Sequence, residues 1–243
     1  IEFTRILSSR GITSFEQIGQ LVDQDFLKRS RRKRPVSLLA KNQAGIFDLY
    51  SLLSSASIEF LDGNRPCLPW SHLEKHRQNI LVGSNGGDGE IFDALFSGLE
   101  DDRLDAIAKR YDYLEILPVG LHQDLIRRQF VDGEDTIRNM NQRIVELGHK
   151  LNILTVASGH ARYLEPEDHI YRNIVRRGQK KGLSQEYGGM YLRTTDEMLQ
   201  EYAYFGEATA KQLVITNPQR IDQMIGQLEP YPNGKFAPRI AGA

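Results

Sequence analysis

The sequence predicts an α/β protein built from parallel βα units, with a helical C-terminal region. Four short apolar segments have the length of buried strands, at residues 36–40, 80–83, 113–117 and 153–157. Helical patterns separate these segments, and the clearest is an amphipathic pattern over residues 133–151. Strands that alternate with helices of this length are typical of a parallel sheet.

The other elements follow from apolar spacing and capping residues. A 3.6-residue spacing over residues 46–53 predicts a helix behind the first strand, and Ser71 is the expected N-cap of a short helix ending at residue 77. Pro166 suits the first turn of a helix that contains Ile170 and Ile174. Further helices are predicted over 90–99 and 101–110, after a cap at Thr194 or Thr195, over 206–214, and after Pro218.

The number of strands leaves two architectures open. Four strands are too few for a closed (β/α) barrel, which needs about eight. The sequence therefore predicts either an open four-stranded sheet or an incomplete barrel.

Composition excludes several classes of protein. The 243 residues carry 31 Lys and Arg against 32 Asp and Glu, a net charge of −1, which argues against a dedicated nucleic-acid clamp. No apolar run approaches the roughly 18 residues that span a bilayer. The single cysteine, Cys67, excludes an internal disulfide and fits a reducing cytoplasm. The chain begins at Ile1 without a signal-peptide pattern, which favours either a processed start or a piece of something longer.

A dense basic run precedes the first predicted strand. Residues 28–34 hold six basic side chains in seven positions, after a helical segment over residues 1–27. Such runs repel themselves and form solvated linkers, but they can also contact phosphates. Both interpretations stay open for the candidate DNA-contacting residues Arg29, Arg31, Arg32, Lys33 and Arg34.

Parallel sheets form sites at the carboxyl ends of their strands. Those positions here are Lys41 with Asn42, and the loops 84–89, 118–120 and 158–162, where His160 is the histidine. The glycine-rich loop 84–89 lacks the Gly-Lys-Ser/Thr of a P-loop and is interpreted as a tight structural turn.

The other reactive side chains give weaker signals. His72 and His76 are spaced to share a helix face but have no third ligand nearby in sequence, so we expect surface histidines. His122 has polar neighbours in sequence, and Cys67 is expected to be an unreactive thiol. No arrangement of nucleophile, base and orienting group emerges from the residues alone.

Several ordered sequence blocks nevertheless resemble one family. These are SLLAKN at 37–42, LVGS at 81–84, RYDYLEI at 110–116, VASG at 156–159, EDHIYR at 167–172, YLRTTDEML at 191–199 and PRIAGA at 238–243. Together they resemble the PHP (polymerase and histidinol phosphatase) domain of PolC-type DNA polymerase III, in bacterial family C. The resemblance runs from about Pro35 to the C-terminus.

The resemblance implies a fold and a set of boundaries. PHP domains of this family are distorted (β/α)7 barrels, interrupted in sequence by an exonuclease. The chain resembles the part after that insertion, so the missing strands would lie upstream. The implied segments are residues 1–27 as the tail of the exonuclease, 28–34 as a basic linker, 35–230 as the C-terminal part of the PHP domain, and 231–243 as the connection toward the polymerase core.

The resemblance also marks four metal-ligand positions, which fall on Pro35, Gly86, His160 and Arg162. Proline and glycine have no donor side chain, and arginine stays protonated. The resemblance therefore implies a degenerate PHP segment without its metal, in which His160 alone is at most a weak ligand.

The implied function is a scaffolding role in bacterial DNA replication. The parent would be a DNA-directed DNA polymerase, a nucleotidyltransferase that uses Mg²⁺, while this segment has no catalytic residues or cofactor of its own. The implied partners are the remaining polymerase and exonuclease domains, DNA, the sliding clamp and other replisome subunits, in the cytoplasm and without a membrane. The alternatives are a metal-dependent PHP phosphoesterase or 3'-5' exonuclease, and a DNA-binding module.

Overall fold

A computed structural model of the chain describes residues 33–178, 189–231 and 234. The chain divides into two compact units, residues 1–34 and 35–243, and the elements named here belong to the second. The predicted exonuclease tail (1–27) and most of the basic run lie outside the described residues. So does the predicted connection at 231–243, apart from Tyr231 and Gly234.

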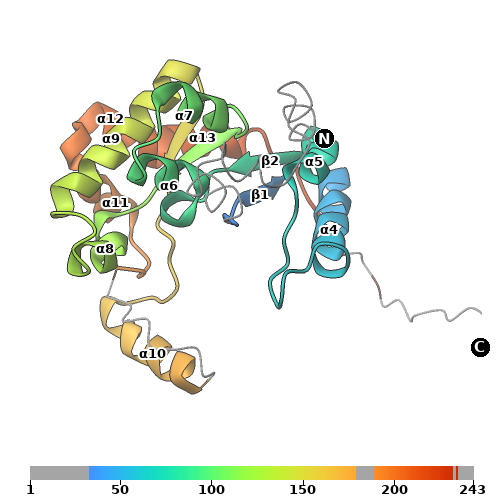
Figure 1. Cartoon of the computed structure of the whole chain (residues 1–243), viewed down its shortest axis with the longest axis horizontal. Coiled ribbons are helices and arrows are strands. Elements are labelled where there is room, and N and C mark those ends of the chain that lie inside the picture. Colours follow the sequence, from blue (N-terminus) through green and yellow to red (C-terminus); the bar gives the residue numbers. More distant parts are fainter. Residues whose placement is uncertain (1–32, 179–188, 232–233, 235–243) are drawn as a thin grey trace, which may run out of the picture. The chain divides into compact units, whose positions relative to one another are not determined.

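Four strands form one sheet in the order β1-β2-β3-β4, with bounds Ser37–Ala40, Ile80–Gly83, Tyr113–Ile116 and Leu154–Ala157 (Figure 1). Strands β2, β3 and β4 are parallel, but β1 pairs antiparallel with β2. The sheet is therefore mixed, and the prediction of parallel strands throughout is wrong for β1.

The reversed direction of β1 follows from how the chain returns to the sheet. Ala40 at the end of β1 pairs with Ile80 at the start of β2, and the Lys41 N–H donates to the Asn79 carbonyl at 2.9 Å. The chain thus leaves β1 and enters β2 at the same end of the strands, which gives an antiparallel pair. A parallel pair would need a crossover connection that runs back to the opposite end.

The helices lie close to their predicted positions, except for α8, which the sequence analysis did not predict. Their bounds are α4 Gln43–Ile58, α5 Trp70–Leu73, α6 Glu90–Phe96, α7 Asp101–Ala108, α8 Gln123–Arg127, α9 Glu134–Leu151, α10 His169–Gly178, α11 Thr195–Glu201, α12 Glu207–Lys211 and α13 Asn217–Asp222. A π-helical turn, Gln212–Thr216, joins α12 to α13. Among the described residues, no helix is both long and apolar enough to cross a membrane.

Capping explains where two helices begin. Thr194, one of the two caps that the sequence leaves open, caps α11 through a reciprocal pair of hydrogen bonds with Glu197. The N-cap of α5 is Pro69 and not Ser71, so that prediction is wrong. Pro69 is already extended there, and the helix starts at Trp70 before tightening into a 3₁₀ turn, Glu74–Asn79.

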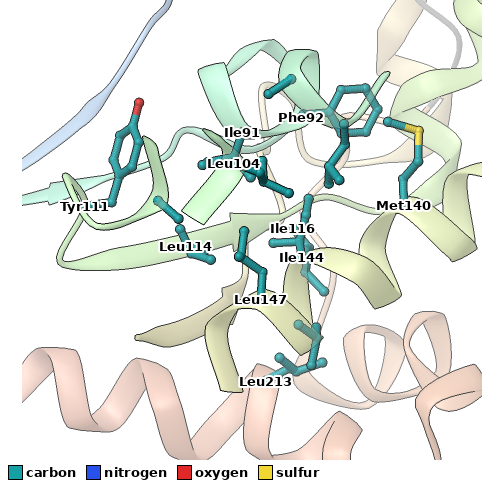
Figure 2. Close-up of a cluster of buried hydrophobic side chains, with 14 of the residues drawn as sticks. Ile91, Phe92, Leu104, Tyr111, Leu114, Ile116, Met140, Ile144, Leu147 and Leu213 are labelled. Atoms are coloured by element: carbon teal, nitrogen blue, oxygen red, sulfur yellow. The ribbon is translucent and has the colours of Figure 1, made fainter. Parts of the chain in front are cut away.

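The core lies on the face of the sheet that α9 covers. Leu114 and Ile116 of β3 pack against Ile144 and Leu147 of α9 within one buried cluster (Figure 2). The alternate residues face the other way, where a smaller cluster joins Leu81, Tyr113, Val156 and Ile221. This alternation is the period-two pattern of a strand with both faces buried.

Helix α9 approaches β4 closely at Gly148. A Cβ at this position would clash with the Oγ1 atom of Thr155 and lie 2.9 Å from the carbonyl oxygen of Ile153. The missing side chain therefore lets the helix rest directly on the strand.

We predict that Gly148→Ala destabilises the protein by about 1–2 kcal/mol, because overpacking of a core outweighs the gain in helix propensity. Urea unfolding would measure the change. Gly178→Ala is the matched control, since no heavy atom lies within 4 Å of that Cβ position in α10. A Gly148→Ala variant as stable as the control would contradict the close approach of helix and strand.

Candidate functional site

The direction of β1 determines which residues share an edge of the sheet. The carboxyl ends of the parallel strands β2, β3 and β4 lie at one edge, and the register of Ser37 with Gly83 puts the start of β1 there too. Pro35, Gly86, His160 and Arg162 therefore all flank this edge, which we call the carboxyl edge.

Lys41 and Asn42 do not belong to the carboxyl edge. Because β1 is reversed, its end lies beside the start of β2, where the Asn42 side chain donates to the Asn79 side chain at 3.1 Å. The prediction that Lys41 and Asn42 join the other strand ends is therefore wrong. Asn42 instead caps α4 by accepting from the Gly45 N–H.

The loop after β2 is the tight turn that the sequence predicts. Asn85 and Gly86 both adopt left-handed backbone conformations, with φ of 57° and 56°, and a 3₁₀ turn runs over Gly86–Asp88. A side chain at Gly86 would meet Leu117 at 2.6 Å. The loop therefore favours glycine at this position on two grounds, its φ and its packing.

Glu115 is a buried carboxylate at the carboxyl edge that the sequence reasoning missed. Its side chain accepts a hydrogen bond from the Asn85 N–H at 3.2 Å, and its own N–H donates to the Ser84 hydroxyl at 2.9 Å. These bonds join β3 to the loop after β2. The available signal was a charged residue inside an apolar strand, in the YLEI segment.

His160 and Arg162 meet in the loop after β4. An Nη2 atom of Arg162 lies 3.4 Å from Nε2 of His160, and the Arg162 backbone N–H donates to the Met190 carbonyl at 2.7 Å. Burial, reinforced by the charge of Arg162, lowers the pKa of His160, against smaller opposing effects of Asp88 and Glu115. The neutral His160 ring can accept a hydrogen bond from the Arg162 guanidinium. Arg162 therefore places a positive charge beside Nε2 of His160.

A second histidine near the carboxyl edge is buried. His122 ends the turn Val119–His122 after β3, and its ring stacks on Phe92 with centroids 4.5 Å apart and 9° between planes. Burial lowers its pKa to about 4. The sequence neighbours of His122 are polar, and they wrongly suggested polar surroundings for its ring. The ring instead packs on Phe92 of α6, which is about 30 residues away in sequence.

His72 and His76 form a structural cluster away from this edge. His76 Nδ1 lies 2.8 Å from an Asp48 oxygen, and the Asn79 side chain donates to the other Asp48 oxygen at 2.9 Å. These two hydrogen bonds lower the pKa of Asp48. His76 thus links the segment before β2 to α4 and is not a plain surface residue. The rings of His72 and His76 are 5.9 Å apart.

An open pocket of about 580 Å³ lies between the loop after β4 and α10. Its lining joins arginine and tyrosine side chains to two aliphatic residues and one carboxylate: Arg162, Tyr163, Leu164, Asp168, Tyr171, Arg172, Val175 and Arg176. Arg162 thus shares this pocket with two further arginines, Arg172 and Arg176.

The residues at the carboxyl edge do not fit a metal cluster. Pro35 and Gly86 offer no donor atom and Arg162 offers a positive charge. Across the parts of the chain that the structure describes, no group of three or more His, Cys, Asp or Glu side chains could hold a metal ion. Instead, Glu115 accepts a hydrogen bond from the backbone, and Arg162 lies beside His160.

The sequence is similar to one segment of several much longer bacterial proteins. These relatives are named DNA polymerase III PolC-type. The protein of Clostridium perfringens is 37% identical over 208 residues, which is 86% of this chain and 14% of the relative. That of Halalkalibacterium halodurans is 35% identical over 239 residues, and that of Bacillus subtilis 32% over 239, each 97% of this chain and 16% of the relative.

The chain therefore spans about one sixth of the length of these curated relatives. No family model matches the sequence. The similarity supports the interpretation as a segment of a PolC-type polymerase.

We predict that His122 makes the stability depend on pH between about 6.5 and about 4. The unfolded state takes up a proton near pH 6.5, whereas the folded state resists until about pH 4, so folding stability falls by roughly 3 kcal/mol on acidification across this window. Urea unfolding at several pH values would measure the slope.

The variant His122→Leu keeps an apolar contact with Phe92 and removes the titrating group. Its stability should therefore depend less steeply on pH than that of the wild type. Parallel pH profiles for the two proteins would contradict the burial of the neutral ring.

Proposed function

We propose that the chain is the C-terminal part of a PHP domain in a PolC-type polymerase, where it serves as a scaffold without metal chemistry of its own. The observation that carries this proposal is the carboxyl edge. Four positions that the family resemblance marks as ligands flank one edge of the sheet, and three of them, Pro35, Gly86 and Arg162, have no metal-donor side chain.

The order of the strands supports the barrel part of the proposal. Strands β2, β3 and β4 are parallel neighbours joined through helices, as in a β/α barrel. On the second face, Leu81, Tyr113 and Val156 are buried beside Ile221 of α13. The upstream part of the PHP domain would therefore add its strands beside the outer strands of this sheet.

The scaffolding role follows from the place of this segment within a barrel. A segment that completes a barrel fixes the positions of the domains connected to it, here the exonuclease upstream and the polymerase core downstream. Mg²⁺ chemistry, contacts with DNA and binding of the sliding clamp would belong to the longer parent in the cytoplasm.

We predict that the purified protein, after incubation with Mn²⁺ or Zn²⁺ and gel filtration, retains less than about one tenth of an equivalent of metal, because a stable site needs several ligands. Elemental analysis would measure the metal, and a chromogenic phosphoester would test for turnover. Stoichiometric metal together with hydrolysis would establish the alternative, a PHP phosphoesterase or 3'-5' exonuclease.

The variant Arg162→His provides a positive control. It removes the cation and offers a second imidazole beside His160, which also feels the charges of Asp88 and Glu115. It should retain more metal than the wild type. Equal, negligible binding by both proteins would count against the assignment of Arg162 as a former ligand position.

The basic run supports a separate proposal, that the parent polymerase touches DNA backbone through Arg29, Arg31, Arg32, Lys33 and Arg34. Replacing all five by alanine should reduce the dependence of log affinity on log salt by as much as about 3.5 for a single strand. Fluorescence anisotropy with a labelled oligonucleotide would measure it. Arg103→Ala with Arg128→Ala is the control, and an unchanged slope in the fivefold variant would identify a plain linker.

A further inference from the structure

The solvent-exposed face of helix α4 carries no charged side chain. The structure describes all 16 residues of this helix, and Asp48 is its only charged residue. Asp48 turns inward, where its carboxylate contacts His76 at 2.8 Å and the Asn79 side chain at 2.9 Å. A helix face that is meant for water normally carries charged and polar side chains.

Large apolar side chains occupy this exposed face instead. The exposed fractions are 72% for Phe47, 51% for Tyr50, 60% for Leu53 and 81% for Ile58. Phe47 and Ile58 are 11 residues apart, about three helical turns, so they share one side of α4. The buried residues Gly45, Leu52 and Ala56 lie on the opposite side.

The residue pattern of this face suits a packed partner. The small residues Ser54 and Ser57 are exposed among the large side chains. Helices pack against one another by fitting large side chains of one helix beside small residues of the other. Contiguous apolar patches of this kind on a soluble protein mark interaction surfaces. Figure 1 shows α4 beside the edge strand β1, at the other end of the sheet from α9.

Residues 229 and 230, near the C-terminus, lie against α4. The Gln43 side chain exchanges two hydrogen bonds of 3.0 Å with the backbone of Glu229, and the Tyr50 hydroxyl donates to the Pro230 carbonyl at 3.1 Å. The polypeptide therefore runs along the flank of α4 at residues 229 and 230. In a longer chain, the downstream polypeptide would follow a segment that passes beside the uncharged face at residues 229 and 230.

We propose that the uncharged face of α4 docks a part of the polypeptide that comes after residue 243 in PolC-type polymerases. The relatives are about six times longer than this chain, and tethering gives a downstream segment a high local concentration at α4. A second copy of the chain lacks that advantage. The inference rests on the proposed function, because it names the partner that the scaffold would hold.

Site-specific photo-crosslinking in the full-length gene product that carries this sequence tests the proposal. A benzophenone amino acid in place of Leu53 should crosslink, within the same polypeptide, to a peptide downstream of residue 243. The same probe in place of Arg103, an exposed residue of α7 with 63% of its side chain accessible, is the control and should give at least about tenfold less product. Mass spectrometry of the digest would identify the linked peptides.

Three results would overturn the proposal. They are crosslinks to a second copy, a yield at position 53 no higher than at position 103, and a gene product that ends at residue 243. Ser54→Glu places a charge in the middle of the face and should abolish the crosslink, whereas Gln219→Glu, an exposed position of α13, should leave it unchanged.

The same preparation separates failure of this inference from failure of the proposed function. Stoichiometric metal and phosphoester turnover with an intact crosslink would reject the metal-free scaffold and keep the docking surface. A missing crosslink in a protein without metal would reject the docking surface alone.

Discussion

The antiparallel pairing of β1 with β2 is the constraint on which the described unit depends. Its ladder, from Ser37 with Gly83 to Ala40 with Ile80, fixes both ends of β1. One end brings Pro35 to the carboxyl edge. The other end starts α4 beside Asn79, so the position of that helix follows from the same ladder.

The polar side chains at the carboxyl edge are bonded to other groups of the protein. The Glu115 carboxylate accepts from the Asn85 N–H, and the Glu115 N–H donates to the hydroxyl of Ser84, which follows β2. On the next loop, Arg162 supplies a cation beside His160. Buried polar groups that are satisfied in this way hold loops in place.

Local patterns revealed the elements, while long-range contacts decided the rest. The four strands and α9 are confirmed because apolar runs and helical periodicity are properties of neighbouring residues. The direction of β1 was not predictable, since a four-residue apolar run is the same in either orientation. The burial of His122 was not predictable from its neighbours because Phe92, its stacking partner, is distant in sequence. The role of Glu115 depends on the Asn85 N–H of another loop, so the apolar pattern of its strand gave no sign of it.

The hydrogen bonds between Gln43 and Glu229 join residues 186 positions apart. Contacts of such separation form late, because a long loop must close before they form. A ribosome adds residues in order, so α4 emerges long before the segment that flanks it. During synthesis Gln43 and Tyr50 of α4 would therefore remain without these hydrogen-bond partners until nearly the whole unit has been made.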